Sequence, residues 1–488
     1  MRVLLFAMPD SGWGFDEVCK VPNLAISSLA GNLDEEIKVG MADLVLVKKR
    51  FGKYVRFFIK KFKPDLVGLS CMTFQYQTSI KICRMIKDID DSIKIVHGGY
   101  HPTLTYKDII KSEDSKYIDY IIRGEGEATL NELTKSLQGK FDIRKIKGLS
   151  YKTKNNRFIN NSNRDLLKPE HIKLPNRKDR FLNNHKMFMK KVDSIETSRG
   201  CIYKCNFCSI VHMYGNSFRD FKTERVCEDI SNAKRQGAKI LMITDDNFTL
   251  FPERVIELCN GIIEAGHDDL YYYTQAGVKG IASSPEMVKK MSKAGFDGVF
   301  LGIENVSERN LKFYNKGKIK NQTEKAVKSL HEHDMIIAGG FVLGSPEDKE
   351  IDFWDNYNFS KELKLDWPVF QILTPYPKTK VTQELHEQGL ITNYMDLRRY
   401  NGTLSNIKTK YLKDYEIRRI QQMMYNRFYH DPNYMRVTKK HHPLFYWTLG
   451  LKYLPRFVKH KVFCSIGHWS DKDIANDMIN LDEKAIID

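Results

Sequence analysis

Three cysteines close together are the strongest sign of chemistry in this sequence. Cys201, Cys205 and Cys208 have the spacing C-x3-C-x2-C within the run RGCIYKCNFC, which covers residues 199–208. Three thiolates at this spacing can bind three separate irons on one face of an iron–sulfur cubane. The next cysteine, Cys227, lies on a predicted helix about five turns further on. One iron would therefore lack a protein ligand and could bind a small molecule.

A structural zinc site is the alternative interpretation of these cysteines. Such a site uses four ligands, usually as two well-separated pairs, and His212 is the residue that could act as the fourth ligand here. The chain would then be a zinc-stabilised scaffold without catalytic activity. Analysis of iron and acid-labile sulfide separates the two interpretations.

The cysteine run resembles the motif of the radical S-adenosylmethionine (SAM) superfamily, in which an aromatic residue, here Phe207, precedes the last cysteine. The resemblance implies a [4Fe–4S] cluster on the three cysteines, with the amino and carboxylate groups of SAM on the fourth iron. It also implies that one electron from the cluster cleaves SAM to a 5′-deoxyadenosyl radical, which abstracts hydrogen from an unactivated carbon. A reductase such as flavodoxin or ferredoxin would supply that electron.

Further polar residues follow the strand order of this superfamily. The second predicted strand after residue 193 ends in Asp245, Asp246 and Asn247, where the resemblance implies groups that bind the SAM amino group. Seen alone, two adjacent acidic residues at a strand end are just as typical of a helix cap or of solvent exposure. Glu304 ends the fourth strand, where relatives place a Glu or Ser near the ribose or amino acid of SAM.

Residues 193–380 contain the elements that must position these groups. Six βα units fit a partial (β/α)6 barrel, and active sites in such barrels form at the carboxyl ends of the strands. The cysteine run follows the first of these strands. The third strand ends in Thr274 and Gln275, where the superfamily more usually has a basic residue, so the contact from this strand stays open. Strands are expected at residues 194–197, 240–244, 271–275, 298–303, 336–343 and 369–373.

Residues 1–150 alternate in the same way and predict an α/β domain with a doubly wound, Rossmann-like parallel sheet. Strands are expected at residues 3–8, 37–46, 66–70, 93–98 and 117–123. A ligand of this domain should lie beyond the carboxyl ends of the strands. The candidate residues near those ends are Ser70, Thr73, Gly98, Gly99, His101, Gly124, Glu125 and Gly126.

A doubly wound domain ahead of such a barrel resembles the cobalamin-binding branch of the superfamily, over nearly the whole chain. The runs GGYHPT (98–103) and DYIIRGEGE (119–127) look closest to the anaerobic magnesium-protoporphyrin IX monomethyl ester oxidative cyclase and its relatives. The resemblance implies that cobalamin binds here, with Ser70 and Thr73 as hydrogen-bond partners and the glycines keeping the approach open. The acidic residues of the second run also have a structural explanation, because they open a helix.

Cobalamin domains of the better-known kind supply a histidine to cobalt from a D-x-H-x-x-G motif, which this sequence lacks. His101 follows a Gly-Gly pair, and we interpret it as a histidine bonded to the backbone or to a cofactor amide. The radical SAM branch commonly lacks a protein ligand from that motif, so its absence weakens the cobalamin prediction only slightly.

The rest of the chain gives weaker signals. Residues 151–192 read as a polar connector rich in Asn, Lys and Arg, and residues 381–488 as a helical, aromatic region. Its segment 445–457 either packs on the barrel or lies against a membrane surface. No apolar run approaches the ~20 residues needed to span a bilayer.

The formal net charge is +17, from 78 Lys and Arg against 61 Asp and Glu. The basic residues are scattered, which favours a solvated surface over an anionic substrate, a membrane surface or nucleic acid as the explanation. The sequence starts with a strand pattern and not with a leader, and its nine cysteines do not suggest a disulfide framework. A reducing cytoplasm is therefore expected.

C-methylation of an unactivated carbon in a small molecule is the preferred function, with one SAM for the radical and a second for remethylating cobalamin. An anionic or lipid-like substrate suits the positive charge, but only weakly. Oxidative ring closure on a tetrapyrrole-like substrate is the enzymatic alternative. A nucleic-acid-binding protein with a structural cluster is the alternative of another class, and strong salt dependence of binding would reveal it.

Overall fold

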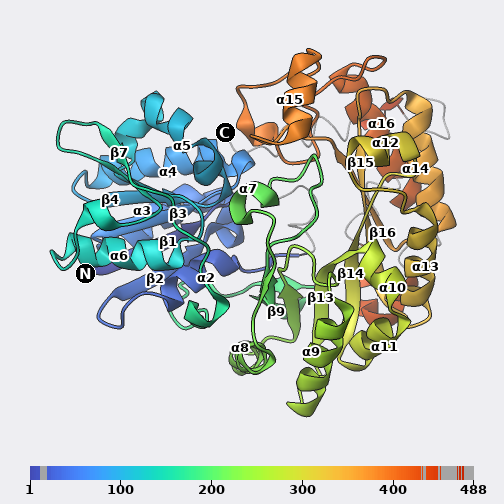
Figure 1. The fold of residues 1–488 in the computed structure, drawn as a ribbon, viewed down its shortest axis with the longest axis horizontal. Coiled ribbons are helices and arrows are strands. Elements are labelled where there is room, and N and C mark those ends of the chain that lie inside the picture. Colours follow the sequence, from blue (N-terminus) through green and yellow to red (C-terminus); the bar gives the residue numbers. More distant parts are fainter. Residues whose placement is uncertain are drawn as a thin grey trace.

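Two parallel sheets organise the chain, one on either side of the cysteine run (Figure 1). The structure is a computed structural model, which describes residues 1–10, 19–429, 431, 436–448, 451, 470, 472–473 and 475–476. The expected α/β architecture is confirmed, with a doubly wound sheet first, a partial barrel second and helices towards the carboxyl end of the described chain.

The first sheet has seven strands in the order β2-β1-β3-β4-β5-β6-β7. The first five strands are parallel, and β6 and β7 add an antiparallel edge. This edge extends the sheet past residue 150, into the stretch whose composition predicts a connector. The strands are β1 (Arg2–Ala7), β2 (Lys38–Asp43), β3 (Leu66–Ser70), β4 (Lys94–Gly98), β5 (Tyr120–Ile122), β6 (Leu149–Lys152) and β7 (Phe158–Asn160).

Alternating side chains bury both faces of this sheet. On β1, Leu4 and Phe6 join the core under one helical layer, whereas Val3 and Leu5 join the core under the other. This alternation follows from the period of two in a strand, and it requires helices on both sides. One layer contains α3 (Phe51–Phe62), α4 (Tyr76–Ile89) and α5 (Tyr100–Lys111), and the other α2 (Leu24–Gly31) and α6 (Glu127–Leu137).

Two predicted strands of this sheet are shorter than expected, for local reasons. The strand expected at 37–46 ends at Asp43, because the Asp43 carboxylate accepts a hydrogen bond from the Val45 amide and starts a 3-10 helix. The strand expected at 117–123 starts only at Tyr120, because a 3-10 helix occupies Glu113–Tyr117. Apolar residues continue past the strand ends in both segments, so hydrophobicity alone does not locate the boundary.

The second sheet has the order β16-β15-β14-β13-β12-β9-β8, and its six strands from β9 to β16 are parallel. The expected open barrel of six strands is thereby confirmed. A short antiparallel pair, β10 and β11, lies beside it. The strands are β8 (Lys186–Met187), β9 (Lys190–Ile195), β10 (Ser198–Arg199), β11 (Arg219–Asp220), β12 (Ile240–Ile243), β13 (Tyr271–Gly277), β14 (Phe296–Glu304), β15 (Ile336–Leu343) and β16 (Trp367–Ile372).

Helices cover the outer face of the barrel, and its inner face is left for the site. On β14, Val299 and Leu301 pack in the core beneath the helices, whereas Phe300 and Gly302 line an inner cavity. The covering helices are α8 (Thr223–Arg235), α9 (Pro252–Glu264), α10 (Val278–Ser283), α11 (Pro285–Lys293), α12 (Glu308–Phe313), α13 (Lys320–His331) and α14 (Glu350–Glu362), whereas α7 (Ile210–Tyr214) follows the cysteine run and packs against α5.

Helices α15 (Lys380–Glu387), α16 (Asp414–Tyr429) and α17 (Arg436–His441) follow the barrel, and α16 packs against α14 and β16. Of the aromatic segment 445–457, residues 449–450 and 452–457 lie outside the described part. Phe445 is buried, whereas Trp447 and Leu451 are exposed. Among the described residues, no helix is both long and apolar enough to cross a bilayer.

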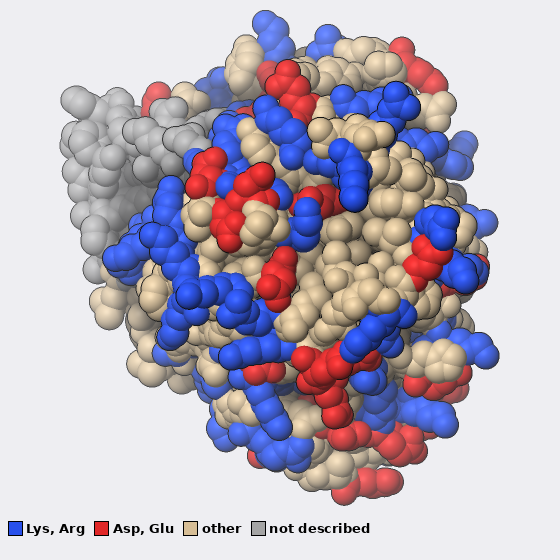
Figure 2. All heavy atoms as spheres, turned by 90° about the vertical axis from the view of Figure 1, so that its left-hand side faces the viewer, with Lys and Arg blue, Asp and Glu red and all other residues tan. Residues whose placement is uncertain are grey.

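Charged side chains are distributed widely over the face formed by the first domain (Figure 2). Lys and Arg are widespread on this face, and Asp, Glu and many uncharged residues lie between them. This distribution agrees with the scattered basic residues of the sequence and with a solvated surface.

Candidate active site

The three cysteines lie in a loop between the short strands β10 and β11. Their sulfur-bearing side chains are half-buried and line one cavity of about 240 Å³ at the carboxyl ends of the barrel strands. Phe207 also lines this cavity, and its ring stands edge-on against Tyr314, with 5.4 Å between the centroids. The sequence therefore brings the predicted cluster ligands together at the expected end of the barrel.

Backbone hydrogen bonds hold this loop against the segment that follows α12. The Asn206 amide donates to the Tyr314 carbonyl at 3.0 Å, and the Asn206 side chain donates to the Phe313 carbonyl at 2.7 Å. The loop starts at Gly200, whose φ of +86° few side chains adopt. A Cβ at this position would lie 2.3 Å from the Ser217 carbonyl oxygen. Only glycine fits at this crossing.

Burial raises the pKa of all three thiols, and that of Cys208 reaches about 12. The thiols are therefore protonated near neutral pH without metal, and metal binding must displace their protons. Among the described residues, no group of three or more His, Cys, Asp or Glu side chains is arranged to hold a single metal ion. A zinc scaffold would need such a group, whereas a cubane accepts thiolates on separate irons.

The three polar residues after β12 have different surroundings. Asp245 is buried and turns to the start of the loop, where its carboxylate accepts a hydrogen bond from the Thr197 amide at 2.7 Å. Asp246 accepts from the Gly200 amide at 2.8 Å and lines the cavity. Burial raises the pKa of Asp246 to about 6. Asn247 also lines the cavity, so Asp246 and Asn247 remain the predicted SAM contacts on geometric grounds, and Asp245 supports the loop.

Glu304 ends β14 in a left-handed conformation with a φ of +68°. Non-glycine residues in this region store strain and are frequent at functional sites. The Glu304 carboxylate lies in the cavity, 2.7 Å from the ammonium of Lys316. Burial by itself lowers the pKa of Lys316, but the Glu304 carboxylate outweighs it and raises that pKa, so Lys316 is charged.

Lys316 was not predicted from the sequence. It places in the cavity the basic side chain that the third barrel strand lacks. Gln275 lines the cavity where relatives more usually have a basic residue, and the Thr274 side chain is buried. Among the described residues that line this cavity, Lys316 is the one cationic side chain. It lies in a loop 12 residues after Glu304, and no motif marks it in the sequence.

The candidate cobalamin residues occupy the carboxyl edge of the first sheet. Ser70 and Gly98 are the last residues of the neighbouring strands β3 and β4, and Gly124 follows β5. A Cβ at Gly98 would have no neighbour nearer than 3.9 Å, and one at Gly124 none within 4 Å. Gly99 has a φ of +97°, and its Cβ would lie 2.8 Å from the Cys71 carbonyl oxygen, so Gly99 serves a tight turn.

Thr73 and His101 are buried and lie next to each other, with 3.4 Å between the Thr73 hydroxyl and His101 Nδ1. The His101 ring packs against Tyr76, with a centroid distance of 4.4 Å. Burial lowers the pKa of His101 to about 4, so it is neutral. This geometry fits the interpretation of His101 as a hydrogen-bonded histidine.

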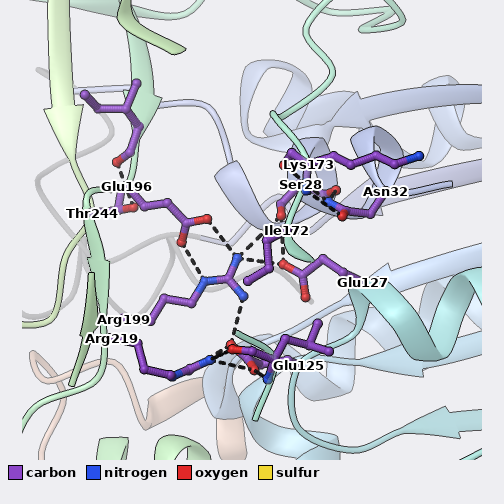
Figure 3. Close-up of polar contacts among 12 residues, drawn as sticks. Ser28, Asn32, Glu125, Glu127, Ile172, Lys173, Glu196, Arg199, Arg219 and Thr244 are labelled. Atoms are coloured by element: carbon purple, nitrogen blue, oxygen red, sulfur yellow. Dashed lines mark hydrogen bonds and ion pairs between the residues drawn. The ribbon is translucent and has the colours of Figure 1, made fainter. Parts of the chain in front are cut away.

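The turn after β5 does not present its carboxylate to the open edge. Glu125 is buried and pairs with Arg199 and Arg219 of the second domain, as Figure 3 shows. Gly126 packs closely, because a Cβ there would lie 2.8 Å from the Leu29 side chain. Contact of Glu125 and Gly126 with a cofactor stays a prediction.

Tyr100, the first residue of α5, lies where the carboxyl ends of the two sheets face each other. Helix α5 packs against α7, which follows the cysteines (Figure 1). Burial, together with Tyr214, Asp246 and Cys208, raises the pKa of Tyr100. The edge of the first sheet therefore faces the cysteine loop directly.

Comparison with known proteins agrees with this geometry. The B12 binding domain family matches residues 19–134, and the Radical SAM superfamily matches residues 195–359. An uncharacterised methyltransferase of Pyrococcus horikoshii is 30% identical over 413 residues, which are 84% of this chain and 88% of that protein. The chain belongs to the cobalamin-binding radical SAM family.

Two further comparisons fit this radical SAM family. An anaerobic magnesium-protoporphyrin IX monomethyl ester cyclase of Cereibacter sphaeroides is 23% identical over 410 residues, 82% of this chain and 64% of that protein. The solved structure of the cobalamin-dependent SAM radical enzyme OxsB, with aqua-cobalamin and SAM bound, has a TM-score of 0.69. The sequence identity to OxsB is 18%, over 100% of this chain and 76% of that chain, so this likeness concerns the fold.

As a member of this family the protein is an enzyme that uses a [4Fe–4S] cluster, SAM and cobalamin. The residues present fit these groups. Three thiols around one cavity supply the cluster ligands, and Asp246, Asn247 and Lys316 offer partners for the charged groups of an amino acid. The space beyond Gly98 and Gly124 lets a large flat ring approach the first sheet.

Proposed function

We propose that this radical SAM enzyme is a methyltransferase that methylates an unactivated carbon of a small molecule. When bound, the cluster and SAM supply a carbon-centred radical, and cobalamin supplies a methyl group. The similarity to a methyltransferase over 88% of that protein's length supports this activity. Methyl transfer of this kind needs both cofactors to reach one substrate.

The contact between α5 and α7 carries the proposal. Tyr100 belongs to the glycine-rich edge of the first sheet, yet it lies near Tyr214 and Cys208 of the cluster loop. A corrin at that edge would face the same space as SAM on the cluster. The proximity of the two cofactors is what a shared substrate requires.

The side chains of the cavity have distinct tasks in this proposal. The Lys316 ammonium attracts a carboxylate, and Glu304 holds that ammonium in place. The Asp246 carboxylate accepts hydrogen bonds from a donor such as an ammonium group. The side chains of Phe207, Phe300 and Val342 exclude water from the reacting carbon.

The proposed partners are a small-molecule substrate and an external electron donor, for which an acidic flavodoxin or ferredoxin suits the charge of +17. An anionic or lipid-like substrate suits the same charge. The exposed Trp447 and Leu451 support a peripheral contact with a membrane surface. We place the enzyme in the cytoplasm, where free thiols stay reduced.

Oxidative ring closure is the second candidate, because the cyclase of Cereibacter sphaeroides resembles this chain over 410 residues. The two activities differ in what happens to SAM. Methylation consumes a second SAM and releases S-adenosylhomocysteine, whereas ring closure requires only 5′-deoxyadenosine formation.

The test is anaerobic reconstitution with iron, sulfide and hydroxocobalamin, followed by desalting and absorption spectroscopy. SAM and dithionite are then added, and 5′-deoxyadenosine and S-adenosylhomocysteine are quantified. We expect a ~410 nm cluster band, retained corrin absorption and both products. Alanine variants of the three cysteines should lose the band and 5′-deoxyadenosine. Products without S-adenosylhomocysteine would favour ring closure, and a cluster that survives the triple substitution would refute the assignment of the ligands.

A further inference from the structure

Two arginines enclose the loop that contains the cluster cysteines. Strands β10 and β11 pair antiparallel, with Arg199 opposite Arg219. Residues 200–218 therefore form a loop whose two ends meet at these arginines. Cys201 lies two residues after Arg199 in the chain. A movement of Arg199 would therefore also move Cys201, the first predicted cluster ligand.

Both arginines bind the same carboxylate of the other domain. Arg199 Nη1 lies 2.9 Å from Glu125 Oε1, and Arg219 Nη2 lies 2.9 Å from the same oxygen. Arg219 Nη1 donates to the second oxygen, Oε2, at 3.1 Å. Glu125 belongs to the turn between β5 and α6, at the cofactor edge of the first sheet. Figure 3 shows the arginines and Glu125 converging from the two domains.

The other two nitrogens of Arg199 also donate hydrogen bonds. Its Nη2 donates to Glu127 at 2.6 Å and to Glu196 at 2.8 Å, and its Nε donates to Glu196 at 2.8 Å. Glu127 in turn accepts from the Ser28 hydroxyl at 2.7 Å. A planar guanidinium that donates from all three of its nitrogens has little freedom to rotate, so the contact fixes orientation as well as distance.

These side chains are buried, with 9% or less of the Arg199, Glu125, Glu127 and Glu196 side chains exposed. Buried ion pairs often contribute little net stability compared with apolar residues of the same size, whereas they do fix geometry. Fold stability alone therefore does not explain five charged groups at this boundary.

We propose that Arg199 and Arg219, through Glu125, are positioning residues that set the distance between the [4Fe–4S] cluster and the corrin. The proposal rests on the proposed function in requiring both cofactors at one substrate. The arginines hold the base of the cluster loop, and the contact of Tyr100 with Tyr214 adds a second attachment beside it, because the Tyr214 ring lies 5.7 Å from the Arg219 guanidinium. The loop thus has two attachments to the first domain.

The test uses the reconstituted holoenzyme with Glu125→Gln, which keeps the shape of the side chain and removes its charge. The probe is the magnetic interaction between the reduced cluster and cob(II)alamin, measured by electron paramagnetic resonance, because dipolar coupling depends steeply on the distance between spins. We expect unchanged iron and corrin contents, a weaker or broadened interaction, and a ratio of S-adenosylhomocysteine to 5′-deoxyadenosine lowered about 10-fold or more.

Glu132→Gln is the matched control, because Glu132 lies on α6, the helix that follows the Glu125 turn, and pairs with Arg164 outside the barrel. It should leave the magnetic interaction as in the wild type. Arg219→Lys is the second variant, which keeps the charge and loses the two-pronged contact, and it should shift the interaction in the same direction as Glu125→Gln. A wild-type interaction in any folded variant of Glu125 or Arg219 overturns the proposal. Absence of S-adenosylhomocysteine from the wild type would count against methylation only, since the spin interaction does not depend on that product.

Discussion

Lys316 shows how one side chain can complete a site that its strand does not provide. Its side chain is half-buried at the cavity, and its ammonium is bound to Glu304, which a strained φ of +68° holds at the end of β14. A carboxylate-bearing ligand gains from such a cation because the pair is shielded from water. Lys316 is therefore the residue that we propose to bind the carboxylate of SAM.

Substitution of Lys316 should weaken SAM binding more than it affects the cluster. In Lys316→Met we expect the Kd for SAM to rise about 10- to 100-fold, from the loss of a charge-assisted hydrogen bond of about 1.5–3 kcal/mol. Anaerobic equilibrium dialysis with labelled SAM measures this. Lys318→Met is the control, because Lys318 is 84% exposed and pairs with Glu308 at the surface. Equal affinities in the two variants would exclude the proposed contact.

At the scale of the element, the β10–β11 pair determines whether the cysteine loop can form. In Gly200→Ala the methyl group meets the Ser217 carbonyl oxygen at 2.3 Å, and a φ of +86° adds strain. We expect the pair to open, with a loss of about 1–3 kcal/mol of stability and much of the reconstituted iron. Gly215→Ala is the matched control in the same loop, because its φ is +63° and no atom lies within 4 Å of the added Cβ. The two variants are compared by the iron bound per chain after reconstitution and by the urea midpoint of the cofactor-free protein. Equal loss of iron in both variants would show that the positive φ, and not the close approach of Gly200 to Ser217, is what matters.

Elements formed from local sequence were predictable, and their boundaries were less so. The apolar runs at β1 and β15 predicted these strands without any long-range information. The cysteine spacing likewise predicted side chains that meet, and the three cysteines do line one cavity. The ends of β2 and β5 depend on a capping carboxylate and a 3-10 turn, which an apolar run does not reveal. The role of Lys316 depends on where a loop folds back over the cavity, so its position along the chain gives no sign of it.

The contact between the domains belongs to the whole molecule. Glu125 and Arg199 are 74 residues apart in the sequence, and each has a local explanation: one opens a helix and the other precedes a metal-binding loop. Only the packing of the two sheets brings them together. This is why the acidic turn after β5 was predictable as a feature of the cofactor edge but not as the partner of the cluster loop.

Buried histidines should make the stability of the whole molecule sensitive to acid. His97 on β4 is fully buried, and neither ring nitrogen has a hydrogen-bond partner in the described part of the chain. Burial, with a smaller effect of His101, lowers the pKa of His97 to about 3 from its usual 6.5. Between these two values the unfolded chain binds a proton that the folded chain does not, so stability falls as the pH falls.

From pH 7 to pH 5 this one residue should cost about 2 kcal/mol. In His97→Leu that part of the loss disappears, because leucine has no proton to gain and leaves no polar atom unpaired in the core. Urea unfolding of the cofactor-free protein at both pH values, followed by circular dichroism, measures the difference. His171→Gln, at an exposed position, should keep the wild-type slope. If His97→Leu kept that slope as well, His97 would have to be hydrogen-bonded and protonated in the folded protein, contrary to its apolar surroundings between Leu69 and Ile121.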